Sequence, residues 1–390
     1  MSKGSLGLLS AYWPEDTPRY AHIPLKTICD VTIGPIAESA PDRPALVCPD
    51  GTLTYGDLWQ RVTRCAGALR GRCKSGTRVA SVLRDPAELV VAALAAFEAE
   101  TLNLVSVETL QLQVLSAFVP ELIIGAAQST AAESLTFSEV IALSVTERTQ
   151  RPDLRKPILA LARPDGRGEV LHNHRTLAAT AIAVGAFYML EEGSSVVLLE
   201  PPTTWYTLAL MLGVLHRGAT AWAAWGTDPC PLPDRADYVV CGWNRAGKFL
   251  EDGPERRLPS PIGAGAIVAI EGPFSVSRRR RIARRLRTPV LTLLGRNDLG
   301  PVLGSHPTWF LDDAAGIPLP NVDTRPLNPA DRTPVSIGWD SVAQAELGVK
   351  SPLAPAGGDL SEGWLQTGIA CEVDPTGLYY LHAEGPLHAV

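Results

Sequence analysis

The chain has 390 residues, of which 46% are hydrophobic and 19% charged, and its formal net charge is −6 at pH 7. This composition excludes a disordered chain, and the mild acidic balance argues against nucleic acid as a partner. No apolar run reaches the roughly 18 residues that a membrane span needs, so we expect a cytoplasmic protein with no membrane partner.

The first part of the chain alternates strand and helix patterns. Thr54 with Asp57 three residues later indicates a capping box, which begins a helix with apolar residues at helical spacing. Asp85 followed by Pro86 predicts the start of a second helix. Short apolar runs predict strands at 79–83, 101–107, 122–124 and 158–162.

The middle of the chain repeats this alternation. It predicts helices at 176–190, 205–216 and 276–287, and strands at 196–199, 219–224, 238–241, 267–270 and 289–294. Prolines and glycines then crowd 316–334 and 351–358, and 373–378 reads as a hairpin turn. We therefore expect an α/β core of two stacked subdomains with mixed, largely parallel sheets over residues 1–315, and a small β-rich subdomain over 316–390.

Five segments follow one another in an order typical of a known family. They are ALV at 45–47 with GTLTYGDL at 51–58, LHNHRTL at 171–177, the arginine-rich stretch 277–294, GIPLPNV at 316–322 and WLQTGIA at 364–370. Together they resemble the adenylate-forming superfamily of acyl-CoA synthetases, peptide-synthetase adenylation domains and luciferases. The resemblance covers about residues 28–384 and implies the fold of the N-terminal, AMP-binding domain of these enzymes.

The loop that wraps the ATP phosphates in this family is altered. Its T-G-x-P-K-G core becomes LARPDGRGEV at 161–170, without the hydroxyl side chains and, allowing a one-residue gap, with Gly168 at the lysine position. Asp165 and Glu169 add negative charge that opposes a triphosphate, and only Arg163 and Arg167 offset it. The loop therefore predicts weakened phosphate binding.

Three further features that the family uses for ATP are damaged or missing. In the family's Y-G-x-T-E motif, Leu294 replaces the tyrosine that packs on adenine, although Asn297 and Asp298 could still touch a metal. Ile369 replaces the aspartate that holds the ribose. Glu384 stands near the position of the hinge arginine, and we expect the chain to lack the C-terminal domain in which the family carries its catalytic lysine. We therefore expect that ATP and magnesium binding is lost and that no cofactor is used.

Candidate site residues remain in the matching segments. His172 and His174 are general-base or ligand-contact candidates, or else a helix-start pair satisfied by backbone groups. Asp298 is a candidate for a metal or proton-transfer role, or a surface residue on a drifted loop. A ligand pocket is expected near Trp205, which could wall a planar ligand or belong to the core, and its substrate-binding residues would be Thr204, Trp205, Gly272, Leu294, Gly295 and Asn297.

Two other patterns have simpler interpretations. The arginines at 278–281, 284, 285 and 287 resemble a nucleic-acid patch, but their spread around a helix with Ile282 and Leu286 facing inward favours a solvated surface helix. The seven cysteines form no CxxC pair, which favours reduced core thiols.

Three functions remain open. The first is an ATP-independent protein that binds an acyl or aryl carboxylate derivative or thioester, as a transferase or cyclase in a biosynthetic pathway. The second is a non-catalytic protein partner or scaffold of an active ligase or synthase from the same pathway. The third is half of an acyl-CoA ligase whose C-terminal domain comes from another chain.

Overall fold

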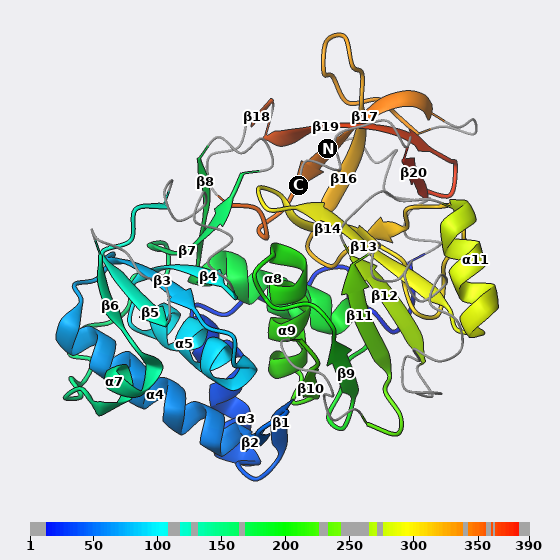
Figure 1. Ribbon diagram of the computed structural model, residues 1–390. Coiled ribbons are helices and arrows are strands. Elements are labelled where there is room, and N and C mark those ends of the chain that lie inside the picture. The colour runs from blue at the N-terminus through cyan, green and yellow to red at the C-terminus, as the bar shows by residue number, and fades with distance from the viewer. Residues whose placement is uncertain are drawn as a thin grey trace.

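The computed structural model describes residues 13–107, 118–125, 132–163, 168–225, 233–242, 265–270, 276–337, 342–355, 360–361 and 363–381. Gly272, Asp165, Arg167, Cys230 and Glu384 lie outside the described residues. The described strands form a nine-stranded, a six-stranded and a five-stranded sheet, with helices between and around them (Figure 1). This arrangement confirms the predicted α/β fold with mixed, largely parallel sheets.

The six-stranded sheet lies in the first half of the chain, in the order β6-β5-β3-β4-β7-β8. Its strands are parallel except for β8, which pairs antiparallel with β7. Their bounds are β3 Arg78–Val82, β4 Leu102–Ser106, β5 Leu122–Gly125, β6 Glu133–Leu135, β7 Pro157–Ala162 and β8 Glu169–Asn173. The strand β8 was not predicted, because the sequence there was interpreted as a loop.

Helices flank this sheet where the capping signals place them. In α4 (Tyr55–Arg72), the Thr54 side chain accepts from the backbone N–H of Asp57 and the Asp57 side chain accepts in return, which confirms the capping box. In α5 (Pro86–Glu98), Asp85 caps the N-terminus. The short helix α7 (Phe137–Ala142) follows β6 and begins with a second capping box.

The nine-stranded sheet has the order β15-β14-β13-β12-β11-β9-β10-β1-β2. Its middle strands are parallel, and antiparallel pairs close both edges. The bounds are β1 Pro44–Cys48, β2 Gly51–Thr54, β9 Ser195–Leu198, β10 Thr220–Ala223, β11 Tyr238–Gly242, β12 Ala266–Ile270, β13 Val290–Arg296, β14 Gly300–Gly304 and β15 Ile317–Pro318. Helix α11 (Val276–Leu286) connects β12 to β13 along the outer flank (Figure 1).

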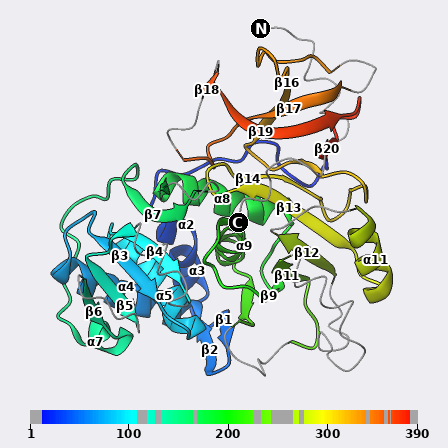
Figure 2. The ribbon, with the colours of Figure 1, turned by 45° about the horizontal axis from the view of Figure 1, so that its top comes forward.

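Two helices form the centre of the molecule. The helices α8 (His174–Phe187) and α9 (Trp205–His216) pack against each other, between the two large sheets (Figures 1 and 2). Both are buried around nearly their whole circumference, as expected for helices that are apolar on every side. Helix α8 begins two residues before the predicted start, because the Asn173 side chain accepts from the backbone N–H groups of Arg175 and Thr176. The short helices α2 (Ile28–Val31) and α3 (Ile33–Ser39) precede β1.

The C-terminal part is a five-stranded antiparallel sheet that lies beyond β14 in Figure 2. Its strands are β16 Asp323–Leu327, β17 Val342–Lys350, β18 Leu360–Ser361, β19 Trp364–Val373 and β20 Tyr379–Leu381. The predicted hairpin turn joins β19 to β20, and the Asp374 carboxylate accepts from the backbone N–H groups of Thr376 and Leu378.

Helix α11 departs from the solvated helix that its charges suggested. Ile282 is buried as expected, but Arg279 is buried as well, at 0% exposure. The two residues are three apart and therefore share a helix face. Arg279 is thus part of the interior, whereas Arg280, Arg281 and Arg284 are exposed.

No helix among the described residues is long and apolar enough to cross a bilayer. The described part of the chain also contains no group of three or more histidine, cysteine, aspartate or glutamate side chains that could hold a metal ion. Among the described residues, cysteines 29, 48, 65, 241 and 371 are buried, Cys73 is half-buried, and none of the six forms a disulfide.

Candidate functional site

The centre of the candidate site is a stacked pair of rings from different segments. His172 lies on β8 and Trp205 is the first residue of α9. Their ring centroids are 3.8 Å apart and their planes differ by 15°. Both side chains have 0% exposure, so no water-sized space adjoins either ring. The position where a ligand pocket was predicted is therefore occupied by the chain's own side chains.

The hydrogen bonds of His172 define its protonation. Its Nε2 atom lies 2.8 Å from the backbone oxygen of Asn297. Because a carbonyl oxygen only accepts, Nε2 carries the proton and Nδ1 is an unprotonated acceptor. Burial lowers the pKa of His172 to about 4, so the ring is neutral at pH 7. A neutral imidazole of such low basicity is a hydrogen-bonding group rather than an efficient general base.

His174 lies in a different environment. It begins α8, and its Nδ1 atom accepts from the backbone N–H of Ile28 at 3.1 Å. Burial, and to a smaller extent the positive charge of Arg148, lower its pKa to about 3. This contact favours the interpretation of His174 as a helix-start residue bonded to the backbone through Nδ1, although its buried Nε2 has no partner among the described residues. The structure does not place His174 with His172.

The segment 294–298 forms a closed set of internal bonds. Arg296 holds Asp298 through two parallel contacts, from Nε to Oδ1 at 2.9 Å and from Nη2 to Oδ2 at 3.0 Å. The remaining guanidinium nitrogen of Arg296 donates to the backbone oxygen of Thr367 at 2.6 Å, which joins β13 to β19. A carboxylate held by a bidentate arginine is a poor metal ligand, because binding a cation would require breaking both contacts. Arg296 was not among the predicted site residues.

The polar groups of Asn297 and Gly295 also have hydrogen-bond partners. Asn297 donates through Nδ2 to the backbone oxygen of Ala162 at 2.8 Å, and so links the segment 294–298 to β7. The Tyr206 hydroxyl donates to the backbone oxygen of Gly295. Leu294 is buried at 7% exposure. The structure therefore brings Asn297 and Gly295 to the ring pair, and their polar groups already have partners.

At the described ends of the loop 161–170, the structure corrects the expected charge balance. Glu169 does not stand as an uncompensated charge, because Arg78 of β3 forms an ion pair with it. The backbone N–H of Arg163 donates to the backbone oxygen of Gly168 at 3.0 Å, which closes the base of the loop. The repulsion expected from Glu169 toward a polyphosphate is therefore reduced.

Three polar atoms at the ring pair lack partners among the described residues. They are His172 Nδ1, Trp205 Nε1 and Thr204 Oγ1, and all three are buried. Thr204 is the N-cap of α9, yet its side chain makes no capping bond. A buried donor or acceptor without a partner costs roughly 1–3 kcal/mol, and such atoms gather where a ligand or ordered water completes the bonding.

The buried histidines predict a pH-dependent stability. Because the folded pKa of His172 is about 4, against about 6.5 for an ordinary histidine, the unfolded chain binds more protons between these values. The free energy of unfolding should therefore fall by about 2 kcal/mol from His172 alone between pH 7 and pH 5. Urea unfolding at both pH values measures this loss. In the His172→Gln variant, the fall in the free energy of unfolding between pH 7 and pH 5 should be about 2 kcal/mol smaller. An equal fall in the variant and in the unaltered chain would contradict the lowered pKa of His172.

Comparisons with known proteins confirm the resemblance to adenylate-forming enzymes. The family model described as AMP-binding enzyme matches residues 36–110, and no curated protein sequence matches the chain. The N-terminal subdomain of Klebsiella oxytoca NpsA, in complex with 3-hydroxyanthranilyl-AMSN, has a TM-score of 0.77 and 18% identity, covering 92% of this chain and 99% of the other. The benzoate CoA ligase of Burkholderia xenovorans gives 0.76 and 18%, over 92% and 80%. ATP-bound MatB of Rhodopseudomonas palustris gives 0.75 and 17%, over 90% and 78%.

Proposed function

We propose that this chain, which has the fold of the N-terminal domain of adenylate-forming enzymes, works without ATP and binds an aryl or acyl carboxylate derivative at the ring pair of His172 and Trp205. The observation that carries the proposal is the set of three buried, unpartnered polar atoms at this pair. The proposal includes a reaction of the bound compound, of the transferase or cyclase type.

The contacts of residues 294–298 support the part of the proposal that the chain works without ATP. The resemblance assigns the end of the Leu294–Asp298 motif to phosphate and magnesium, and Arg296 occupies the Asp298 carboxylate with two hydrogen bonds. Freeing Asp298 for a cation would leave a partly buried guanidinium without its partner, which is expensive. We therefore expect neither ATP nor magnesium to bind here.

The ring pair supports the part of the proposal that an aryl or acyl carboxylate derivative binds here. Two parallel rings 3.8 Å apart present flat faces, which suit a planar ligand once one ring moves aside. The Trp205 N–H would donate to a carbonyl oxygen, while His172 Nδ1 would accept from a hydroxyl or N–H group of the ligand. The names of two structures with the same fold, the benzoate CoA ligase and the 3-hydroxyanthranilyl complex, suggest aryl compounds as the first probes.

Calorimetry in the absence of ATP tests this proposal. The probes are benzoate, 3-hydroxyanthranilate and the benzoyl thioester of N-acetylcysteamine. At least one should bind, and Thr204→Val, which removes the unpartnered hydroxyl while keeping the shape, should weaken it about fivefold to tenfold. Thr63→Val on the outer face of α4 is the matched control and should leave binding unchanged. No binding of any probe, or equal binding to both variants, would contradict the proposal.

The second candidate is a non-catalytic partner of an active ligase or synthase. The specific observation in its favour is the zero exposure of both rings, because a ligand would first have to displace Trp205. In that case the unpartnered atoms would remain without partners, at a cost of roughly 1–3 kcal/mol each. Probe binding that is absent from the isolated chain but present after addition of the partner enzyme would favour this candidate.

A further inference from the structure

The six-stranded sheet contains a second place suited to ligand binding, away from the ring pair. From β3 the chain passes through α5 to β4, which pairs with one edge of β3. The strand β5 pairs with the other edge of β3, and β6 lies beyond β5. Connections therefore leave β3 and β5 in opposite directions. In open parallel sheets, the crevice at the carboxyl ends of two such strands is where ligands bind.

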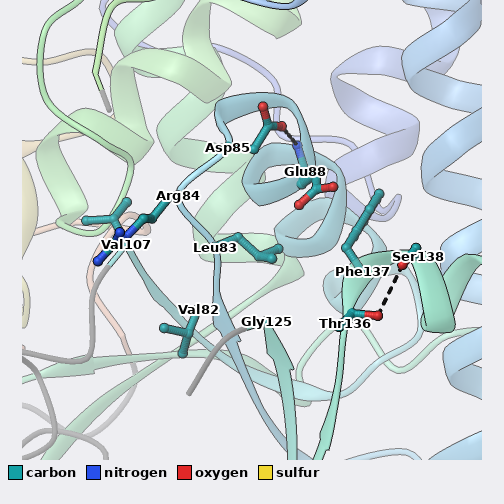
Figure 3. A pocket seen from close by; sticks show the side chains of 10 residues that line it. All are labelled: Val82, Leu83, Arg84, Asp85, Glu88, Val107, Gly125, Thr136, Phe137 and Ser138. Carbon is teal, nitrogen blue, oxygen red and sulfur yellow. Dashed lines mark hydrogen bonds between the residues drawn. The ribbon is translucent and has the colours of Figure 1, made fainter. Parts of the chain in front are cut away.

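A cavity of about 570 Å³ occupies this crevice. Its lining comes from the ends of β3, β4 and β5 and from the starts of α5 and α7 (Figure 3). This volume lies in the range of small-molecule sites. Gly125, which ends β5 with φ +123°, approaches β3 so closely that a Cβ atom would lie 1.8 Å from the backbone oxygen of Val82.

The charged groups of the cavity do not neutralise one another. Asp85 accepts from the backbone N–H of Glu88 through Oδ1 at 2.7 Å, so part of its charge is used as a helix cap. Within the described part of the chain, no ion pair is made by the side chains of Glu88 or Arg84. Burial raises the pKa of Glu88, and the charges of Asp85 and Asp50 raise it further.

The rest of the lining is mainly apolar. Val82 and Leu83 are buried, and Val107 and Phe137 are half-buried at the wall. Figure 3 shows Glu88 above Phe137 and Arg84 beside Val107, so the negative and positive groups stand at separate ends of the cavity. The hydroxyl of Thr136 is engaged by Glu139 in the capping box of α7 and is not available to a ligand.

We infer that this cavity binds a small ω-amino carboxylic acid, in which an apolar body separates the amine from the carboxylate. The ammonium group would lie between Glu88 and Asp85, the apolar body against Leu83 and Phe137, and the carboxylate near Arg84. Two carboxylates are too few to hold a metal ion, and Arg84 would repel one. The inference is independent of the function proposed for the ring pair.

Three matched probes test the inference by calorimetry at pH 7.5 on the full chain. 6-Aminohexanoate carries both charges at opposite ends of an apolar chain, pentylamine lacks the carboxylate, and hexanoate lacks the amine. We expect 6-aminohexanoate to bind most tightly, pentylamine several-fold more weakly, and hexanoate at least tenfold more weakly. Hexanoate binding as tightly as 6-aminohexanoate, or no binding of 6-aminohexanoate at about 10 mM, would overturn the inference.

Two substitutions test whether Glu88 and Arg84 contact the charged groups of the ligand. Glu88→Gln should weaken the binding of 6-aminohexanoate and pentylamine about tenfold, whereas Arg84→Gln should weaken 6-aminohexanoate and leave pentylamine unchanged. Glu147→Gln, at an exposed glutamate away from the cavity, is the control and should change neither. Thr204→Val should also leave amine binding intact, so failure here and failure at the ring pair are separate results. Equal affinities for Glu88→Gln and the unaltered chain would overturn the inference.

Discussion

Replacing Arg279 by methionine should destabilise the fold by roughly 3–5 kcal/mol, because the substitution leaves buried acceptors without a donor. Arg279 is fully buried, and its guanidinium lies 5.1 Å from the centre of the Phe310 ring. It donates to the Ser305 hydroxyl and to four backbone oxygens, those of Val290, Leu311, Asp312 and Ala314. One side chain thereby fastens residues 305–314 to α11 and β13.

Urea unfolding measures this effect, with Arg281→Met as the matched control. Arg281 is exposed on the same helix, so its replacement should change the free energy of unfolding by less than about 0.5 kcal/mol. Arg279→Lys keeps the charge but has too few donors in the right geometry, so it should rescue only part of the loss. Equal stability of Arg279→Met and Arg281→Met would show that the buried network contributes nothing.

Replacing Trp205 by alanine should cost roughly 3–5 kcal/mol and create a cavity that a flat aromatic molecule can fill. Trp205 has 0% exposure and stacks on His172, so its removal leaves one face of the imidazole without a contact. Indole at about ten times its dissociation constant should restore about 1.4 kcal/mol. Thermal unfolding with and without indole measures the rescue.

The half-buried Trp309 supplies the control for this experiment. Trp309→Ala should be less destabilising, and indole should not restore its stability, because no enclosed cavity forms there. If indole stabilised both variants equally, it would be acting nonspecifically. If it stabilised neither, the neighbourhood of Trp205 would have collapsed, which would remove the basis for a planar ligand at this position.

Much of the fold could be predicted because local signals agree with the final structure. The cap residues Thr54 and Asp85 start α4 and α5 where the sequence placed them. Helix α9 has the predicted bounds, since an apolar run of this length between a proline-containing turn and a glycine-containing turn has few alternatives. Segments 51–58 and 364–370 then identified the family fold.

The candidate site was less predictable, because its contacts join residues far apart in sequence. Nothing local indicates that His172 stacks on Trp205 or bonds to the backbone of Asn297, since these contacts depend on how β8, α9 and β13 meet. The role of Arg296 was missed because it occupies the variable position of the family motif. Its spacing of two from Asp298 was the available signal.

Arg279 was missed for a different reason. Its neighbours are also arginines, so the helix was interpreted from its charged composition and the periodicity of its inward face was not applied to Arg279. Its spacing of three from Ile282 and seven from Leu286 places all three on one face, and this pattern would have predicted a buried guanidinium. The cavity beside β3 was missed because a crevice between β3 and β5 follows from strand order, which the sequence alone did not supply.

The most direct test of the account is calorimetric titration of the chain with ATP, with and without magnesium. If Asp298 is held by Arg296 as the structure has it, millimolar ATP should give no binding heat in either condition. A micromolar dissociation constant, equivalent to about −8 kcal/mol, would contradict the ATP-independent function. It would make half of an acyl-CoA ligase, completed by a second chain, the leading function.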